Sequence, residues 1–141
     1  MYTVIAYIIV FVFLLINTIT DLKRRKIWLP LSAALIVLGI IFHSMVPGLH
    51  PAASLTGLLP GLLLLGIAAV NGQAIGKGDA LSICACGSML GLKLTFRITL
   101  LSLFLAAAWA LLLLLRKKAD RQTKIAFMPF LLCAYVFMLF F

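Results

Sequence analysis

Apolar residues fill most of this chain in long stretches, and short clusters of charged residues separate them. Residues 1–20, 27–76, 98–115 and 125–141 contain no Lys, Arg, Asp or Glu. A helix needs about 20 mainly apolar residues to cross a bilayer, so these stretches are long enough for several membrane-spanning helices. The pattern therefore predicts an all-α integral membrane protein.

Turn-forming and charged residues divide the apolar stretches into six predicted transmembrane helices, within a single membrane-embedded domain over residues 1–141. The predicted helices cover 3–20, 29–45, 53–70, 79–92, 94–115 and 125–141. As a helix the fourth segment rises only about 21 Å, against a hydrocarbon core of about 30 Å. We therefore expect a six-helix bundle with a short fourth segment.

Small residues and cysteines fit a tightly packed bundle. Two Gly-xxx-Gly pairs, 57–61 and 87–91, predict close approach of helix backbones. The three cysteines, Cys84, Cys86 and Cys133, lie in apolar stretches and lack the spacing of a metal or redox motif. They are interpreted as small buried side chains.

The composition agrees with the hydrophobic pattern, since 65% of the residues are hydrophobic, 11% are charged and the mean hydropathy is +1.26. A net charge of +9 alone would suit a nucleic-acid partner. However, ten of the twelve Lys and Arg residues fall in loops that six alternating helices place on one side: four in 21–26, Lys77, and five in 116–124. The positive-inside rule explains this bias, with those loops in the cytoplasm and both termini outside, and no nucleic-acid partner is predicted.

The three acidic residues, Asp21, Asp79 and Asp120, all fall on the predicted cytoplasmic side. Two carboxyl groups held a few ångströms apart share a proton, because both cannot ionise cheaply. The ionised member can take a proton from water while the protonated member polarises a carbonyl, which hydrolyses a peptide bond without a metal. Asp21 and Asp79 are therefore the candidate catalytic pair, Asp120 is interpreted as a solvated loop charge, and no cofactor or metal is predicted.

Four further residues are candidates for supporting or substrate-binding roles. Gly76 and Gly78 leave the backbone bare beside the second aspartate, so that an extended substrate can lie against it. Lys77 lies between these glycines. Asn17 precedes the first aspartate by one helical turn and shares its face, where the amide can hydrogen-bond to the carboxyl.

Helix termini predict different roles for the two aspartates. Asp79 opens a predicted helix, where free N–H groups and the macrodipole favour a carboxylate. Asp21 closes a predicted helix, where unsatisfied carbonyls disfavour negative charge, although the basic run that follows opposes this effect. The balance predicts Asp79 as the ionised base and Asp21 as the protonated acid.

Three sequence elements in register resemble the type IV prepilin peptidases, a family of membrane aspartic proteases whose hallmark is Gly-x-Gly-Asp. These elements are ITDLKRRKI (19–27), GKGDALS (76–82) and KIAFMPFLLCAY (124–135). In that family the first catalytic aspartate ends the first helix before a basic run, which is the place of Asp21. The second follows Gly-x-Gly, which is the place of Asp79, and a late Pro-Phe element opens the last helix, as AFMPF does here.

The resemblance implies cleavage of prepilin or pseudopilin leader peptides at the cytoplasmic face of the bacterial inner membrane, with membrane lipid as the other partner. It implies service to a type IV pilus or protein secretion system, in the short form without a methyltransferase region, similar to the peptidases of Flp-type (tight adherence) systems. Two alternatives stay open: a small transporter or channel that uses Asp79 as an ion or proton site, and an inactive family member that acts in pilus assembly. Taken singly, Asp79 also fits a helix N-cap and Asp21 a counter-charge for the basic run.

Overall fold

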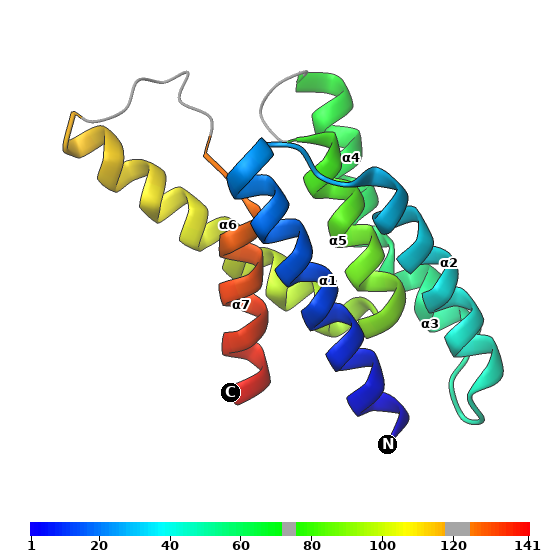
Figure 1. Ribbon diagram of the computed structural model, residues 1–141. Helices are drawn as coiled ribbons and strands as arrows, with labels where there is room; N and C mark the ends of the chain where they lie inside the picture. Colours follow the sequence, from blue (N-terminus) through cyan, green and yellow to red (C-terminus); the bar gives the residue numbers. More distant parts are fainter. Residues whose placement is uncertain (72–75, 118–124) are drawn as a thin grey trace.

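Helices that follow one another along the chain run in alternating directions, except that α3 and α4 run one after the other in the same direction (Figure 1). The computed structural model describes residues 1–71, 76–117 and 125–141. The helices in these residues are α1 (Tyr2–Arg24), α2 (Leu29–Met45), α3 (Pro51–Gly57), α4 (Leu59–Asn71), α5 (Lys77–Leu90), α6 (Leu92–Leu115) and α7 (Met128–Phe140). The predicted all-α class is confirmed for the described part of the chain.

Three helical segments are long and apolar enough to cross a membrane by length and composition: Tyr2–Arg24, Pro51–Asn71 and Leu92–Leu115. Two shorter apolar helices accompany them, Leu29–Met45 and Met128–Phe140. Many large apolar side chains of these helices are exposed, as expected of surfaces that face lipid. The chain is thus a membrane protein, while the count of six crossings stays a prediction.

The first helix is longer than the hydrophobic pattern predicted. It continues through the start of the basic run to Arg24, so Asp21 lies in its last turn rather than beyond its end. Arg25 then ends the helix with a left-handed backbone (φ 50°), and its N–H donates to the carbonyl oxygen of Asp21 at 2.8 Å. Basic side chains such as Lys23 and Arg24 are favourable in the last turn of a helix, because they lie at the negative end of the macrodipole. The helix therefore continues past the last apolar residue of the stretch.

The third apolar stretch forms two helices, although one was predicted over 53–70. Between them Leu58 donates its N–H to the carbonyl three residues earlier, at 3.2 Å, in the pattern of a tighter turn. Pro60 has no N–H for the carbonyl four residues before it, which accounts for the interruption. The two helices keep a common direction (Figure 1).

The short helix α5 lies at the centre and packs against α1, α2, α3, α4 and α6. Nine of its fourteen residues are buried, so protein rather than lipid surrounds most of it. A Cβ on Gly57 of α3 would overlap the carbonyl oxygen of Gly87, which means that the two backbones touch there. Ser54 Oγ donates to the carbonyl of Ser88 at 2.7 Å, and Ser88 Oγ donates to that of Leu35 at 3.3 Å, which ties α5 to α3 and α2.

The predicted packing roles hold for most of the glycines and cysteines. A Cβ on Gly61 would collide with Cys84 of α5, as expected of a close helix contact. Gly91 has a φ of 79° and ends α5. Its Cα also lies close to α3, since a Cβ on Gly57 would be 3.1 Å from it. Cys84 and Cys86 are buried, whereas Cys133 is exposed on α7, and the prediction of a buried side chain was wrong for Cys133.

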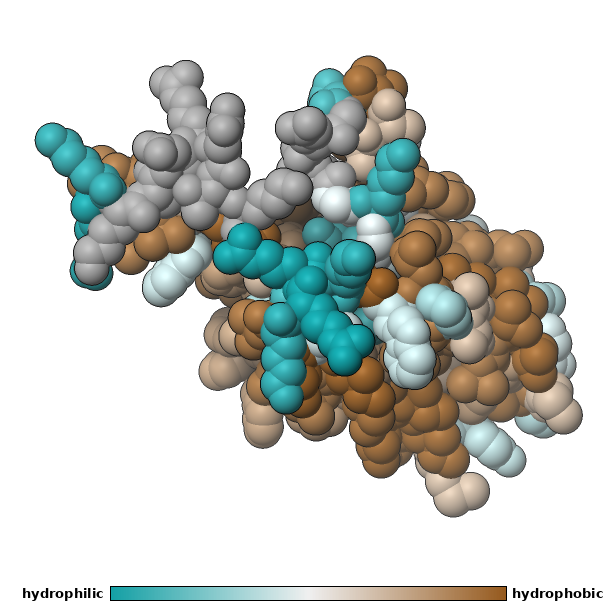
Figure 2. Space-filling view, turned by 45° about the horizontal axis from the view of Figure 1, so that its top comes forward, coloured by the Kyte–Doolittle hydropathy of each residue, from teal (hydrophilic) through white to brown (hydrophobic). Residues whose placement is uncertain are grey.

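Charged residues gather at the end of the bundle where α1 ends and α5 begins, and Figure 2 shows hydrophilic residues there above an apolar body. The described charged residues at the end of α1 and the start of α5 are Asp21, Lys23, Arg24, Arg25, Lys26, Lys77 and Asp79, and Arg116 and Lys117 follow the end of α6. Both chain termini lie at the opposite end (Figure 1). The predicted polar loop over 116–124 lies outside the described residues from 118 onward, as do residues 72–75 of the predicted break before α5.

Candidate active site

Asp21 is held at a junction between α1 and α7. It lies in the last turn of α1 and is 8% exposed. The backbone N–H of Met128, the first residue of α7, donates to Asp21 Oδ2 at 3.4 Å. The first N–H groups of a helix have no intrahelical acceptor and lie at the positive end of the macrodipole, so α7 stabilises a carboxylate at this place.

The segment KIAFMPF places the start of α7 against α1. Pro129 is the second residue of α7, where the missing N–H of a proline breaks no helical hydrogen bond. Two turns later the Tyr135 hydroxyl donates to the backbone carbonyl of Tyr7 on α1 at 2.8 Å. Since Met128 and Tyr135 are both buried, α7 is fixed along α1 from its first residue.

Asp79 lies in the first turn of α5, at the same end of the bundle, and is half-buried. The two glycines before it make room for other side chains. A Cβ on Gly76 would lie 2.7 Å from Asp79 Oδ2, and a Cβ on Gly78 would lie 3.1 Å from the Cβ of Ile27. A larger residue at 76 would therefore displace the carboxyl group, and one at 78 would require the Ile27 side chain to shift by a few tenths of an ångström.

The predictions for the supporting residues, Gly76, Gly78, Lys77 and Asn17, have different outcomes. The space that side chains at Gly76 and Gly78 would fill is occupied by protein, so contact of their backbone with a substrate stays a prediction. Lys77 is exposed at the start of α5. Asn17 is fully buried, but neither its Oδ1 nor its Nδ2 has a hydrogen-bond partner among the described residues. The expected hydrogen bond from Asn17 to Asp21 is therefore not formed.

The two carboxyl groups act on one another through their charges. Asp79 lies outside the three helices that are long enough to cross the membrane. Burial, and secondly the negative charge of Asp21, raise the pKa of Asp79 to about 7. This shift, with the Met128 N–H directed at Asp21, favours a shared proton on Asp79. The roles predicted from the helix termini, with Asp79 as the base and Asp21 as the acid, stay a prediction, although this shift favours the opposite assignment.

Sequence reasoning missed the Met128 N–H and the Ile27 contact with Gly78. A signal for the Met128 N–H was present, since KIAFMPF was recognised as the start of a helix. That pattern does not show which residue the start of the helix contacts. Within the described ranges, no three His, Cys, Asp or Glu side chains lie together in a group that could hold a metal ion.

The fold and the site together define a class of protein. It is a helical membrane protein with two interacting carboxyl groups at its charged end. Residues 8–111 match the model of the type IV leader peptidase family. This range is more than half of the chain and contains both Asp21 and Asp79, so the chain belongs to that family and the resemblance seen in its motifs is confirmed. Comparisons with curated proteins and with solved structures gave no match.

Membership implies a protease that acts on the leader peptides of prepilin-like proteins in general. α7 lies outside the matched residues. The part that α7 takes in the site therefore rests on the contact between Met128 and Asp21.

Proposed function

We propose that this protein is a membrane aspartic endopeptidase that removes the leader peptide of type IV prepilin-like substrates, with water activated by Asp21 and Asp79. The observation that supports this proposal most strongly is the electrostatic interaction of two carboxyl groups from α1 and α5, within the residues matched to the family. A pair with one proton supplies both a general acid and a general base.

In the proposed reaction Asp21 is the base and Asp79 is the acid. The water oxygen bonds to the scissile carbonyl carbon as Asp21 takes a proton from that water and Asp79 gives its proton to the carbonyl oxygen. The tetrahedral intermediate then breaks its C–N bond. The leaving amine takes the proton held by Asp21, and a hydroxyl of the intermediate returns a proton to Asp79. The Met128 N–H holds the ionised Asp21 in place between turnovers.

We further propose that six hydrophobic segments place this pair at the cytoplasmic face of the bacterial inner membrane. The gathering of basic residues at the same end supports that orientation. A substrate would then present a short polar leader in the cytoplasm, followed by an apolar helix in the bilayer. The basic run 23–26 lies where it can meet anionic lipid headgroups.

Co-expression with prepilins from the same genome tests the proposal, with loss of the leader followed on a gel. We expect cleavage by the unaltered protein and a decrease of about 10²–10⁴-fold in Asp21→Asn and in Asp79→Asn, because each removes one half of the acid–base pair. Both variants should insert and accumulate normally. Asp120→Asn is the matched control and should cleave at the unaltered rate, as should the unaltered protein in a chelator.

Full cleavage by Asp21→Asn or Asp79→Asn would refute the pair as the catalytic groups. Activity lost in a chelator and restored by zinc would assign the reaction to a metal. Ion or proton flux that depends on Asp79, with no cleavage of any prepilin, would favour the transporter alternative.

A further inference from the structure

The two aspartates belong to separate sets of helices. Close contacts at Gly39, Gly57 and Gly61 hold α2, α3 and α4 against α5, the helix of Asp79. Among the described residues, every side-chain hydrogen bond between helices falls within one set. These bonds join Ser82 with Ser32, Ser54 with Ser88 and Ser88 with Leu35 around α5, and Asp21 with Met128 and Tyr135 with Tyr7 between α1 and α7.

The contact between α1 and α5 is where the two sets meet at the candidate active site. Each of these helices contributes one aspartate, and they pack against one another. A peptide bond that is attacked by the pair has to reach both carboxyl groups, so the cleaved segment lies between α1 and α5. α7 is tied to α1 at Met128 and again at Tyr135, whereas no side-chain hydrogen bond in the described ranges ties α1 to α5. The α1–α5 contact is therefore the one that can separate to admit a substrate.

Two polar side chains on the buried face of α1 have no hydrogen-bond partner in the described part of the chain. The unpaired atoms are both amide atoms of Asn17 and the hydroxyl oxygen of Thr18. These residues precede Asp21 by four and three positions, so both are its neighbours on the helix surface. An unpaired polar group inside a protein costs free energy, and three such atoms beside a candidate catalytic group indicate a partner that the chain itself does not supply.

That partner has to enter from outside, because no water-sized space adjoins the Asn17 side chain, which is 0% exposed. A substrate backbone has the required chemistry. In a helix the scissile carbonyl is hydrogen-bonded, so the segment around it has to unwind before water attacks. Lipid offers no hydrogen bonds to the N–H and C=O groups that are freed in this way, and the protein must supply them. The Asn17 amide has an acceptor and two donors, and the Thr18 hydroxyl can donate or accept.

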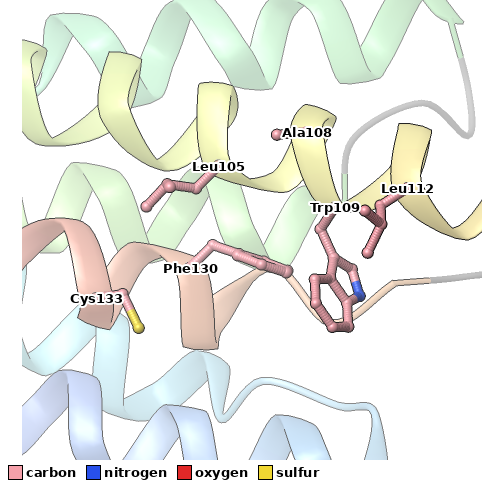
Figure 3. A pocket seen from close by; sticks show the side chains of 6 residues that line it. All are labelled: Leu105, Ala108, Trp109, Leu112, Phe130 and Cys133. Carbon is pink, nitrogen blue, oxygen red and sulfur yellow. The ribbon is translucent and has the colours of Figure 1, made fainter.

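The apolar groove between α6 and α7 does not supply such groups. It has a volume of about 410 Å³, and Figure 3 shows its largely apolar lining of Leu105, Ala108, Trp109, Leu112, Phe130 and Cys133. Phe130 and Cys133 lie about half a turn around α7 from Met128 and Tyr135, which contact α1. α7 therefore separates this groove from Asp21, and the groove has the character of a surface that faces lipid.

We propose that Asn17 and Thr18 bind the unwound backbone of the substrate next to the bond that is cut. This inference rests on the proposed function. Asn17 lies about 6 Å from Asp21 along α1, toward the end of the bundle that holds the termini. An extended peptide advances about 3.3 Å per residue, so Asn17 meets the backbone about two residues from the scissile bond. In the proposed orientation this is the membrane side, and the bound residues are those that follow the cut.

Nearly isosteric apolar substitutions test this role, because they remove the polar groups and keep most of the volume. We expect Asn17→Leu to raise the KM for membrane-inserted prepilin about tenfold, since two hydrogen bonds to the substrate are lost, and Thr18→Val to raise it about threefold. Each should also raise the Tm in detergent by about 4 °C, because an unpaired buried group is removed. A residue with a purely structural role would not combine higher stability with weaker binding.

Thr95→Val is the matched control. The Thr95 hydroxyl is also buried without a partner among the described residues, but it lies near the start of α6, which follows the end of α5 remote from Asp79. Its Tm should rise in the same way, while KM and kcat should not change.

Disulfide crosslinking locates the bound segment. In a Cys84→Ala, Cys86→Ala, Cys133→Ala, Asp79→Asn variant, Thr18→Cys supplies the only thiol and the substrate stays uncut. A single cysteine is moved through about the first ten residues after the cut of a co-expressed prepilin, and the membranes are oxidised. We expect crosslinks at about the second and third residues and none beyond about the sixth. Thr95→Cys in place of Thr18→Cys should give no crosslink.

The outcomes separate failure of this inference from failure of the protease proposal. Cleavage by the unaltered protein, with unchanged KM in Asn17→Leu and Thr18→Val or without crosslinks near the cut, would overturn the inference alone. A lower Tm for Asn17→Leu would show that its amide is paired inside the protein and would also overturn it. So would an altered pH dependence at unchanged KM, which would assign the amide to Asp21. Absence of cleavage by the unaltered protein would refute the protease, and the crosslinks would still decide whether this face of α1 binds a prepilin.

Discussion

The two aspartates of the site have different surroundings at the scale of single residues. Asp21 accepts an N–H from the start of α7, and Asp79 is half-buried and interacts with the charge of Asp21. The first contact stabilises a carboxylate, whereas the second environment stabilises a neutral carboxylic acid. This difference supports the proposal that the pair holds one proton and that Asp79 carries it.

Proteolysis should fall on the alkaline side as Asp79 ionises. The pKa of Asp79 is raised to about 7, so below that pH it carries the proton that the scissile carbonyl needs, and above it both carboxyl groups are charged. We expect kcat/KM to fall by about tenfold per pH unit above about pH 7. The measurement is the pH dependence of prepilin cleavage in proteoliposomes, with infrared titration of the carboxyl groups.

In Asp21→Asn the pKa of Asp79 should be lower, since one cause of the shift is gone, but still above 3.8 because burial persists. A rate that rises through pH 7, or an Asp79 proton already lost well below it, would contradict this assignment.

We predict that Gly76 is required for catalysis, because the carboxyl group of Asp79 occupies the space that a side chain at position 76 would fill. A Cβ there would lie 2.7 Å from Asp79 Oδ2, which is too close for both atoms to stay. We expect Gly76→Ala to lower kcat by about 10²-fold, the effect of misplacing a catalytic group by about 1 Å. Gly66→Ala on α4 is the control, because a Cβ at Gly66 has no atom within 4 Å, and its cleavage rate should not change. Equal rates for the two variants would show that the Asp79 carboxyl can move without loss.

At the scale of elements, α7 contributes to the candidate active site as well as to the packing of the bundle. Its first N–H contacts Asp21, and its Tyr135 hydroxyl holds it to α1. α7 therefore helps to fix the position of a candidate catalytic group that belongs to another helix. α5 has the complementary task, since its small buried residues allow neighbouring helices to approach and so fix the position of Asp79.

Loss of the Met128 N–H should weaken catalysis more than loss of the Met128 side chain. Met128→Pro removes the N–H and the long side chain, whereas Met128→Ala removes only the side chain. We expect kcat for Met128→Pro to be about tenfold below that for Met128→Ala, the lower range for a hydrogen bond to a charged group. Because the Met128 side chain is fully buried, thermal unfolding in detergent must accompany the kinetics of both variants. Equal kcat values in two folded variants would exclude a part for this N–H.

At the scale of the whole molecule, charge is separated along the bundle. The basic run after Asp21 and the start of α5 share one end, and both termini lie at the other (Figure 1). Regions rich in Lys and Arg stay in the cytoplasm during insertion, so this separation supports the proposed direction of the bundle in the membrane. In that direction, a substrate would present its leader on the cytoplasmic side.

Thiol labelling should show this direction. In a variant without the three native cysteines, His50→Cys and Lys26→Cys place exposed thiols at opposite ends of the bundle. We expect a membrane-impermeant maleimide to label His50→Cys in intact cells, and Lys26→Cys only after the membrane is permeabilised. The reverse pattern would place the two aspartates outside the cytoplasm and would contradict the proposed site of cleavage.

The sequence by itself determined the class of protein, most helix positions and the two candidate aspartates. Each of these features can be read from a short segment of sequence. An apolar run indicates a helix in lipid, a basic run indicates the end of that helix, and the Gly-x-Gly-Asp motif identifies one of the aspartates. The helix ends were less certain because capping and proline geometry, as at Arg25 and Pro60, decide them. The sequence pattern could therefore state which residues to examine, but not which of them meet.

Only the tertiary structure decided the contacts between those residues. Met128 and Asp21 are 107 positions apart, and nothing in either segment specifies that one helix start should face the other carboxyl group. The same holds for Asp79 against Gly76, for Gly78 against Ile27 and for the groove between α6 and α7. Such contacts depend on which helix faces pack together, and packing is decided by the shapes of all neighbouring side chains at once. For that reason the helix termini alone could not show that the start of α7 meets Asp21, and the assignment of the shared proton stays a prediction.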